Sequence, residues 1–125
     1  MSEGLADEGK SAPTGALIKL ATESWRFSRL FARLIQRLDA SEQQRYGNQL
    51  RFYASALEDS VTAAGLTLVN LEGQPYDSGM AATALNASDF GPDDMLVVEQ
   101  MLEPIIMGAT GVLKSGTVIL AKAPQ

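Results

Sequence analysis

The chain has 125 residues, 46% of them hydrophobic and 20% charged, which is enough for a globular core in one modest domain or two small units. It contains no histidine and no cysteine. These absences exclude the usual general base, thiolate nucleophiles, disulfides and zinc–thiolate sites. No apolar run approaches the roughly 18 residues that span a bilayer. The acidic start also lacks the apolar core of a secretory signal, so we expect a cytoplasmic protein without membrane contact.

The net charge of −5 is unevenly distributed along the chain. Residues 17–39 carry five basic and two acidic side chains, a local charge of +3, whereas residues 66–125 carry seven acidic side chains against two lysines, a local charge of −5. Such asymmetry can orient a partner protein or a second subunit. The acidic second half would repel phosphates, so we expect no nucleic acid partner.

Residues 1–13 are small, polar and acidic, and we expect them to form a disordered tail. A helical dimerisation region, residues 14–64, follows. Its first helix is predicted over about 16–39, where one face is apolar and consists of Leu20, Phe27, Leu30, Phe31, Leu34 and Leu38. Trp25 lies off this face, so we expect it to be exposed or in contact with another chain.

A basic row lies beside the apolar face of the first helix and consists of Arg26, Arg29, Arg33 and Arg37. Charged helix faces are ordinary, so we interpret this row as a solvated face. The alternative is a patch that binds an acidic partner.

A second helix is expected after an interruption at residues 39–49. Two capping boxes can begin it, formed by Asp39 with Glu42 or by Ser41 with Gln44. Gly47 and Asn48 disfavour helix, so we expect a settled helix only from Gln49. A narrow apolar stripe then runs through Leu50, Tyr53, Leu57, Val61 and Ala64. Gly65 ends the helix, because a residue without Cβ adopts the left-handed C′ conformation at little cost.

Two antiparallel helices of this size bury only one stripe each, and so small a hairpin is rarely stable alone. Pairing two chains into a four-helix bundle resolves this. We therefore predict a homodimer whose interface consists of Phe27, Phe31, Leu34, Leu50, Tyr53, Leu57 and Val61.

Residues 65–125 are predicted to form a small β domain, which gives an α+β fold: a helical hairpin followed by a small, mostly-β C-terminal domain. Strands are expected at 66–70, at 95–103 and at 111–123, the last bent at Ser115–Gly116. Residues 80–87 are ambiguous, because their alanines favour helix while turns bound them closely.

The chemistry-bearing residues of this half are few. Asp89, Asp93 and Asp94 could bind a hard cation, but their spacing fails the EF-hand pattern, so we interpret them as a solvated turn around Gly91–Pro92. No Gly-rich phosphate-binding loop is present. We therefore expect no enzyme, no cofactor and no metal site.

Beyond the helices, the order of motifs resembles the GrpE family, the nucleotide exchange factors of DnaK-type chaperones. In that family a helix runs into a glycine, a hydrophobic strand and a Pro–apolar–Asp turn, which Gly65, Leu66, Leu68, Pro75, Tyr76 and Asp77 match in order. The later pattern is matched by Pro92, Met95, Val98, Gln100, Leu113, Lys114, Val118, Leu120, Ala121 and Lys122. The resemblance covers residues 27–123.

The resemblance implies a symmetric dimer with a four-helix bundle and one β domain per chain, which inserts against the nucleotide-binding domain of the chaperone and promotes ADP release. It implies contacts to the partner from Lys114, Leu120, Met95 and Gln100. It also implies a joint between the bundle and the β domain at Gly65, Pro75 and Asp77. An alternative is a dimeric adaptor or scaffold that keeps the fold without exchange activity.

The chain departs from the family pattern in three ways. The family usually has a long paired helix before the bundle, whereas about sixteen residues precede the first helix expected here, and the histidine common after the Pro–apolar–Asp turn is absent. The Gln-Lys-Gly-Tyr-like turn of the family reads QMLEP here, and a short insertion is needed around IIMGAT. We therefore expect either a DnaK-type chaperone or a divergent relative of one as the partner.

Overall fold

The computed structural model describes residues 12–124 of the chain, which divides into two compact units that meet between Thr67 and Leu68. The first unit contains two helices, and the second contains most of a small β-sheet region. The predicted α+β class and the helical hairpin agree with this arrangement. Most of the tail predicted at 1–13 lies outside the described residues, and its last two positions belong to a helix.

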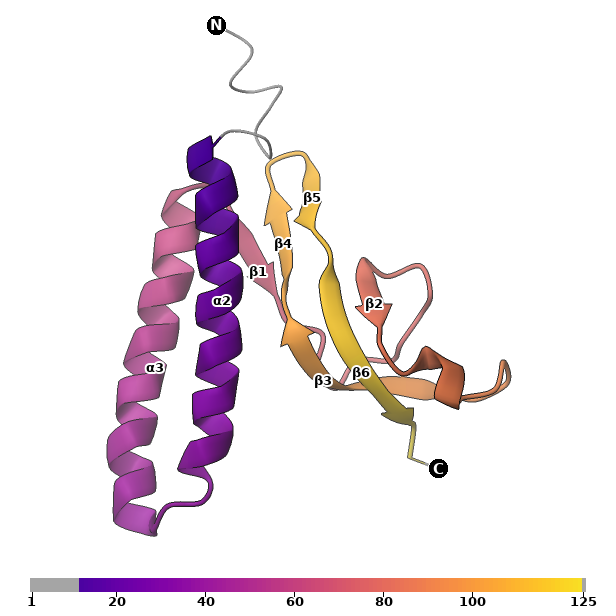
Figure 1. Cartoon of the computed structure of the whole chain (residues 1–125), viewed down its shortest axis with the longest axis horizontal. Coiled ribbons are helices and arrows are strands. Elements are labelled where there is room, and N and C mark those ends of the chain that lie inside the picture. The colour runs from indigo at the N-terminus through magenta and orange to yellow at the C-terminus, as the bar shows by residue number, and fades with distance from the viewer. Residues whose placement is uncertain (1–11, 125) are drawn as a thin grey trace, which may run out of the picture. The chain divides into compact units, whose positions relative to one another are not determined.

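The first unit is an antiparallel hairpin of α2 (Ala12–Ile35) and α3 (Ala40–Ala63), which run side by side (Figure 1). Asp39 is the N-cap of α3, as predicted, because its Oδ1 accepts a hydrogen bond from the amide of Glu42 at 2.9 Å. The Ser41 hydroxyl donates to the same atom at 2.8 Å. These two donors stabilise the ionised form and lower the pKa of the Asp39 carboxyl.

The helix bounds correct two expectations. α2 lies about four residues earlier than predicted, and the turn is closed by the Gln43 side chain, whose Nε2 donates to the carbonyls of Gln36 and Leu38. α3 begins at Ala40, not at Gln49, and continues through Gly47–Asn48. A glycine inside a helix costs about 1 kcal/mol, and an N-cap such as Asp39 contributes about the same amount, so the cap offsets the glycine.

Gly65 ends α3 as predicted. Its φ is +81°, and its amide donates to the carbonyl of Thr62 at 2.9 Å. The amide of Leu66 donates to the carbonyl of Val61, also at 2.9 Å. This pair of bonds is a Schellman motif, which normally brings the first side chain after the glycine against the last turn of the helix. Leu66 and Val61 are both fully buried, which agrees with the hydrophobic contact that often accompanies the motif.

The β structure consists of two three-stranded sheets (Figure 1). One has the order β1-β4-β5, from β1 (Thr67–Val69), β4 (Ile105–Gly108) and β5 (Gly111–Lys114). The other has the order β2-β6-β3, from β2 (Ala82–Ala84), β6 (Gly116–Lys122) and β3 (Leu96–Glu103). β6 is antiparallel to β3 and parallel to β2. A short 3₁₀ turn, η1 (Ala87–Asp89), follows β2.

The chain changes sheet at two single residues. Pro104 separates β3 from β4, and Ser115 separates β5 from β6. The region predicted as one bent strand at 111–123 is therefore two strands, and the expected bend is a crossing from one sheet to the other. Gly116 makes the second crossing possible, because a Cβ there would lie 2.5 Å from Met101 Cε and 2.9 Å from the carbonyl oxygen of Glu103.

The segment 73–76 covers part of the free edge of β3. Val98 in β3 accepts from the amide of Gly73 and donates to the carbonyl of Gln74, at 2.8 and 2.9 Å. Pro75 forms a single bridge to Val97, and the amide of Tyr76 donates to the carbonyl of Leu96. Because an unpaired edge strand invites association, this pairing protects β3.

Candidate interaction surfaces

The hairpin presents an apolar face that nothing within the described chain covers. Phe27 is 63% exposed and Leu34 is 51% exposed, although both are large apolar side chains on α2. The other exposed apolar side chains of the hairpin are Leu20, Leu30, Phe52 and Tyr53. Large exposed apolar side chains are candidates for an interaction site when they share a face, as Leu20, Phe27, Leu30 and Leu34 do on α2.

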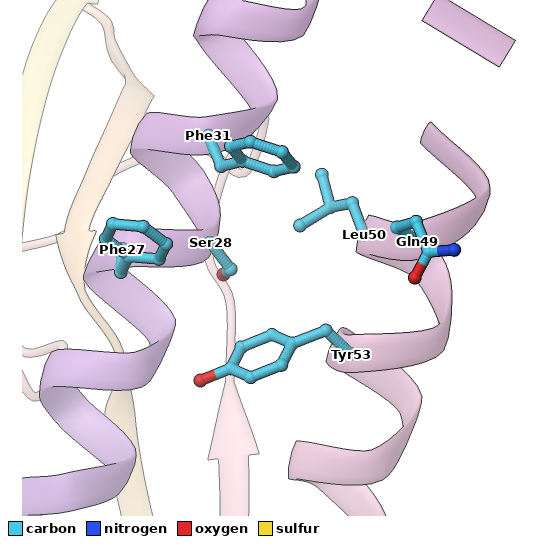
Figure 2. Close-up of a pocket in the computed structure, with 6 residues that line it drawn as sticks. All are labelled: Phe27, Ser28, Phe31, Gln49, Leu50 and Tyr53. Carbon is cyan, nitrogen blue, oxygen red and sulfur yellow. The ribbon is translucent and has the colours of Figure 1, made fainter. Parts of the chain in front are cut away.

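Three apolar grooves follow the line where α2 and α3 meet. The first has a volume of about 250 Å³ and is lined by Phe27, Ser28, Phe31, Gln49, Leu50 and Tyr53 (Figure 2). Phe31 of α2 and Leu50 of α3 point toward one another across it, and Tyr53 reaches from α3 toward α2 (Figure 2). The second groove is lined by residues of the open end of the hairpin and the third by residues of its turn end, with volumes of about 350 and 420 Å³.

Aromatic rings order the wall of these grooves. The rings of Phe27 and Phe31 are stacked, with centroids 6.4 Å apart and planes 9° from parallel. Phe31 also meets Tyr46 of α3 edge to face, with centroids 6.4 Å apart. These ring contacts connect the exposed side of α2 to α3.

Six of the seven side chains predicted for the dimer interface remain at least partly exposed, and Val61 is the exception. Val61 is fully buried within one chain, so it cannot contact a second copy. The stripe pattern placed it on the interface because its spacing continues that of Leu57. In the structure it instead belongs to the Schellman motif with Leu66. Of the residues of α3, all of which the structure describes, Val61 is the one that is buried.

Trp25 corrects a second expectation. It is only 9% exposed in a single chain, not a free surface residue. It belongs to a second buried stripe of α2 with Ala21, Thr22, Ser28 and Ile35. Thr22 and Ser28 are polar, so a search for apolar residues at helical spacing does not detect this stripe. Their hydroxyls are satisfied within the helix, because Thr22 donates to the carbonyl of Ile18 and Ser28 donates to that of Trp25.

Three members of the basic row lie on α2, whereas Arg37 lies in the turn that follows it. Arg26 forms an ion pair with Glu23 at 3.2 Å, and the guanidinium of Arg29 lies 5.4 Å from the ring centroid of Trp25. Arg33 and Arg37 are exposed. Exposed ion pairs such as the first contribute little to stability, so the row adds solubility and positive charge to this side of the hairpin.

The four residues predicted to contact a partner lie in different parts of the β structure. Lys114 ends β5, where its Nζ lies 3.4 Å from Oε1 of Glu103. Met95 directly precedes β3 and is 77% exposed, and Gln100 within β3 is half-buried. Leu120 is a correction: it is only 2% exposed, so it belongs to the core with Val118 and cannot offer an apolar contact.

The residues predicted for the joint are divided between the units. Gly65 lies in the first unit, at the end of α3. Pro75 and Asp77 lie in the second unit, where Pro75 pairs with β3 and Asp77 closes a turn. In this turn Asp77 Oδ1 accepts from the amide of Gly79 and the Asp77 carbonyl accepts from that of Met80. In the structure, Pro75 and Asp77 therefore stabilise the local backbone of the β unit.

The acidic segment Asp89–Asp94 is built as a turn. Asp94 Oδ2 accepts a hydrogen bond from the amide of Gly91 at 2.8 Å, and its Oδ1 lies 3.9 Å from Nζ of Lys122. Among residues 12–124, no group of three or more acidic side chains is placed to hold a metal ion. None of the helices in this range is long and apolar enough to cross a membrane.

Sequence reasoning missed two polar side chains. Asn86 exchanges two hydrogen bonds with the backbone of Leu120, both 2.9 Å long. Glu103 accepts from both Lys114 and Thr117. Both partners lie far away in the sequence, so no local spacing could reveal them. For Glu103 the one available clue was its place at the end of the run predicted as a strand at 95–103, and for Asn86 there was none.

The comparisons with known proteins leave the chain without a match, since no family model, no curated protein and no solved structure matches it.

Proposed function

We propose that the chain is a homodimeric, GrpE-like nucleotide exchange factor for a DnaK-type chaperone or a divergent relative. In this proposal the hairpins of two copies form a four-helix bundle, and the β unit contacts the nucleotide-binding domain of the chaperone. Support comes from the motif order over residues 27–123 and from the succession of a helical hairpin, a glycine and a small β unit.

The exposed apolar face of the hairpin carries the proposal. It includes Phe27, Leu34 and the groove between Phe31 and Leu50. Fully burying a Leu or Phe side chain contributes about 1.5–3 kcal/mol, and a two-fold symmetric contact uses each residue twice. A second copy fits this face best, because its own hairpin offers the same width, length and apolar composition.

The proposed activity needs no nucleophile or general base. An exchange factor acts by binding the open, nucleotide-poor form of its partner more tightly than the closed, ADP-bound form. Thermodynamic reciprocity then requires that ADP lower the affinity of the exchange factor for the chaperone by the same factor by which the exchange factor lowers the affinity for ADP. The β unit, with no histidine or cysteine in the chain, is suited to such a role.

The direct test is the rate of ADP release. A DnaK-type chaperone loaded with fluorescent ADP is mixed with increasing amounts of the protein, and the release rate is followed. We expect a saturable acceleration, and excess ADP should dissociate the complex. Dimerisation without any acceleration would contradict the proposal and favour the adaptor.

Alanine variants of Lys114 and Lys122 form a matched pair for this test. Lys114 and Lys122 both lie in the β unit, and each pairs with an acidic side chain, at 3.4 and 3.9 Å. We expect Lys114→Ala to raise the concentration for half-maximal acceleration by about tenfold, because a charged contact is lost. Lys122→Ala should leave that concentration within about twofold, since exposed pairs contribute little. If the two changes raised the half-maximal concentration equally, a specific contact of Lys114 with the chaperone would be contradicted.

A further inference from the structure

Three strands meet at one carboxylate in the β unit. Glu103, the last residue of β3, accepts a hydrogen bond at Oε1 from Nζ of Lys114, the last residue of β5, at 3.4 Å. The same atom accepts a hydrogen bond from Oγ1 of Thr117 in β6 at 3.0 Å. Glu103 and Thr117 are also opposite each other in the β3–β6 register. Thr117 in β6 therefore orients the Glu103 carboxylate, and the carboxylate contacts the ammonium of Lys114, whose strand belongs to the other sheet.

This arrangement orders a side chain that is otherwise free to rotate about four bonds. The side chains of Lys114 and Glu103 are 31% and 28% exposed, so the ammonium still reaches solvent. An ion pair with this exposure adds little to folding stability. Its main physical consequence is that the lysine side chain favours the direction of Glu103 before any partner arrives.

We propose that Glu103 is a positioning residue that orients Lys114 for contact with an acidic surface of the chaperone's nucleotide-binding domain. The inference rests on the proposed function. Immobilising a long side chain on binding weakens association by roughly two- to tenfold. Glu103 removes part of that cost, because Lys114 is already ordered. Repulsion between Glu103 and an acidic partner acts in the opposite direction, so the sign of the Glu103→Ala effect separates the two contributions.

The experiment is a double-mutant cycle on exchange activity. The variants Glu103→Ala, Lys114→Ala and the double variant are compared with the unchanged protein by the concentration that gives half-maximal release of fluorescent ADP. We expect Glu103→Ala to raise this concentration roughly two- to tenfold. In the Lys114→Ala background the same change should have no further effect, because there is no ammonium left to orient.

Two controls separate positioning from folding. Glu103→Gln keeps the shape of the side chain and an acceptor for Thr117, so it tests the charge if Glu103→Ala lowers the thermal unfolding midpoint. It should raise the half-maximal concentration in the same direction and by less. Asp94→Asn breaks the corresponding pair with Lys122 and should leave the concentration unchanged.

The outcomes distinguish the two proposals. No acceleration by the unchanged protein overturns the proposed function, and this inference with it. Normal acceleration together with a Glu103 effect that persists in the Lys114→Ala background overturns the inference alone. Tighter binding by Glu103→Ala or Glu103→Gln also overturns it, because the carboxylate would then only mask the lysine charge.

Discussion

At the scale of single residues, two glycines respond to the same substitution in opposite directions. A Cβ at Gly116 would lie 2.5 Å from Met101 Cε and 2.9 Å from a backbone oxygen, so we expect Gly116→Ala to destabilise the β unit by about 1–3 kcal/mol. Gly47 lies inside α3, where the nearest atom to a Cβ is Arg51 Nη1 at 3.7 Å. Gly47→Ala should stabilise the hairpin by about 0.5–1 kcal/mol. Urea denaturation followed by circular dichroism measures both, and a loss of stability in Gly47→Ala would contradict the account.

The sequence predicted those residues whose role is local. Asp39 and Gly65 act on the backbone within a few residues of themselves, so their caps are visible in the chain order. Trp25, Val61 and Leu120 were misplaced, because their burial depends on which side of a helix or strand the rest of the chain covers. Periodicity gives the face of an element but does not say what packs on it.

At the scale of elements, β2 depends on a side chain that completes its pairing. The strand has three residues, and the carboxamide of Asn86 continues the pairing by exchanging two hydrogen bonds with the Leu120 backbone. We expect Asn86→Ala to cost about 1–3 kcal/mol, because it leaves a partly buried donor and acceptor without partners. Asn86→Asp should cost at least as much, since it sets a carboxylate oxygen against the Leu120 carbonyl. Asn70→Ala, which removes one exposed bond to Glu72, is the control and should cost less than about 0.5 kcal/mol by thermal unfolding.

The sequence predicted the strands that have a continuous apolar pattern. It did not predict the short strands β2 and β4, which are defined by the strands that they pair with. The strands expected at 66–70 and 95–103 correspond to β1 and β3, and Pro104 directly follows the end of β3. β4 was taken for an insertion, because four residues after a proline carry too short a pattern to indicate a strand. β2 stayed ambiguous, since its partner β6 lies more than thirty residues later in the chain.

At the scale of the whole molecule, the hairpin leaves large apolar side chains exposed in a single chain. Its two helices have 24 residues each, yet in α3 Val61 is the one buried residue of a fully described helix. Most of the stabilisation of a helix in a protein comes from packing an apolar face. The sequence predicted an apolar face on the first helix that its own chain does not cover, and Phe27 and Leu34 are exposed in the structure; Leu38 of that predicted face lies in the turn after α2.

The dimer can be tested through residues that a single chain leaves exposed. Phe27 is 63% exposed on α2, and Leu85 is 60% exposed in the β unit, so an aspartate at either position leaves the packing of one chain nearly unchanged. In a symmetric bundle, Phe27→Asp would bury an unpaired carboxylate twice, at several kcal/mol for each copy. We expect this variant to sediment as a monomer at concentrations where the unchanged protein is a dimer, with the dissociation constant raised at least about a hundredfold. Leu85→Asp should remain dimeric. An unchanged protein that is monomeric at tens of micromolar, or a Phe27→Asp variant that dimerises normally, would show that the exposed face of the hairpin serves another contact.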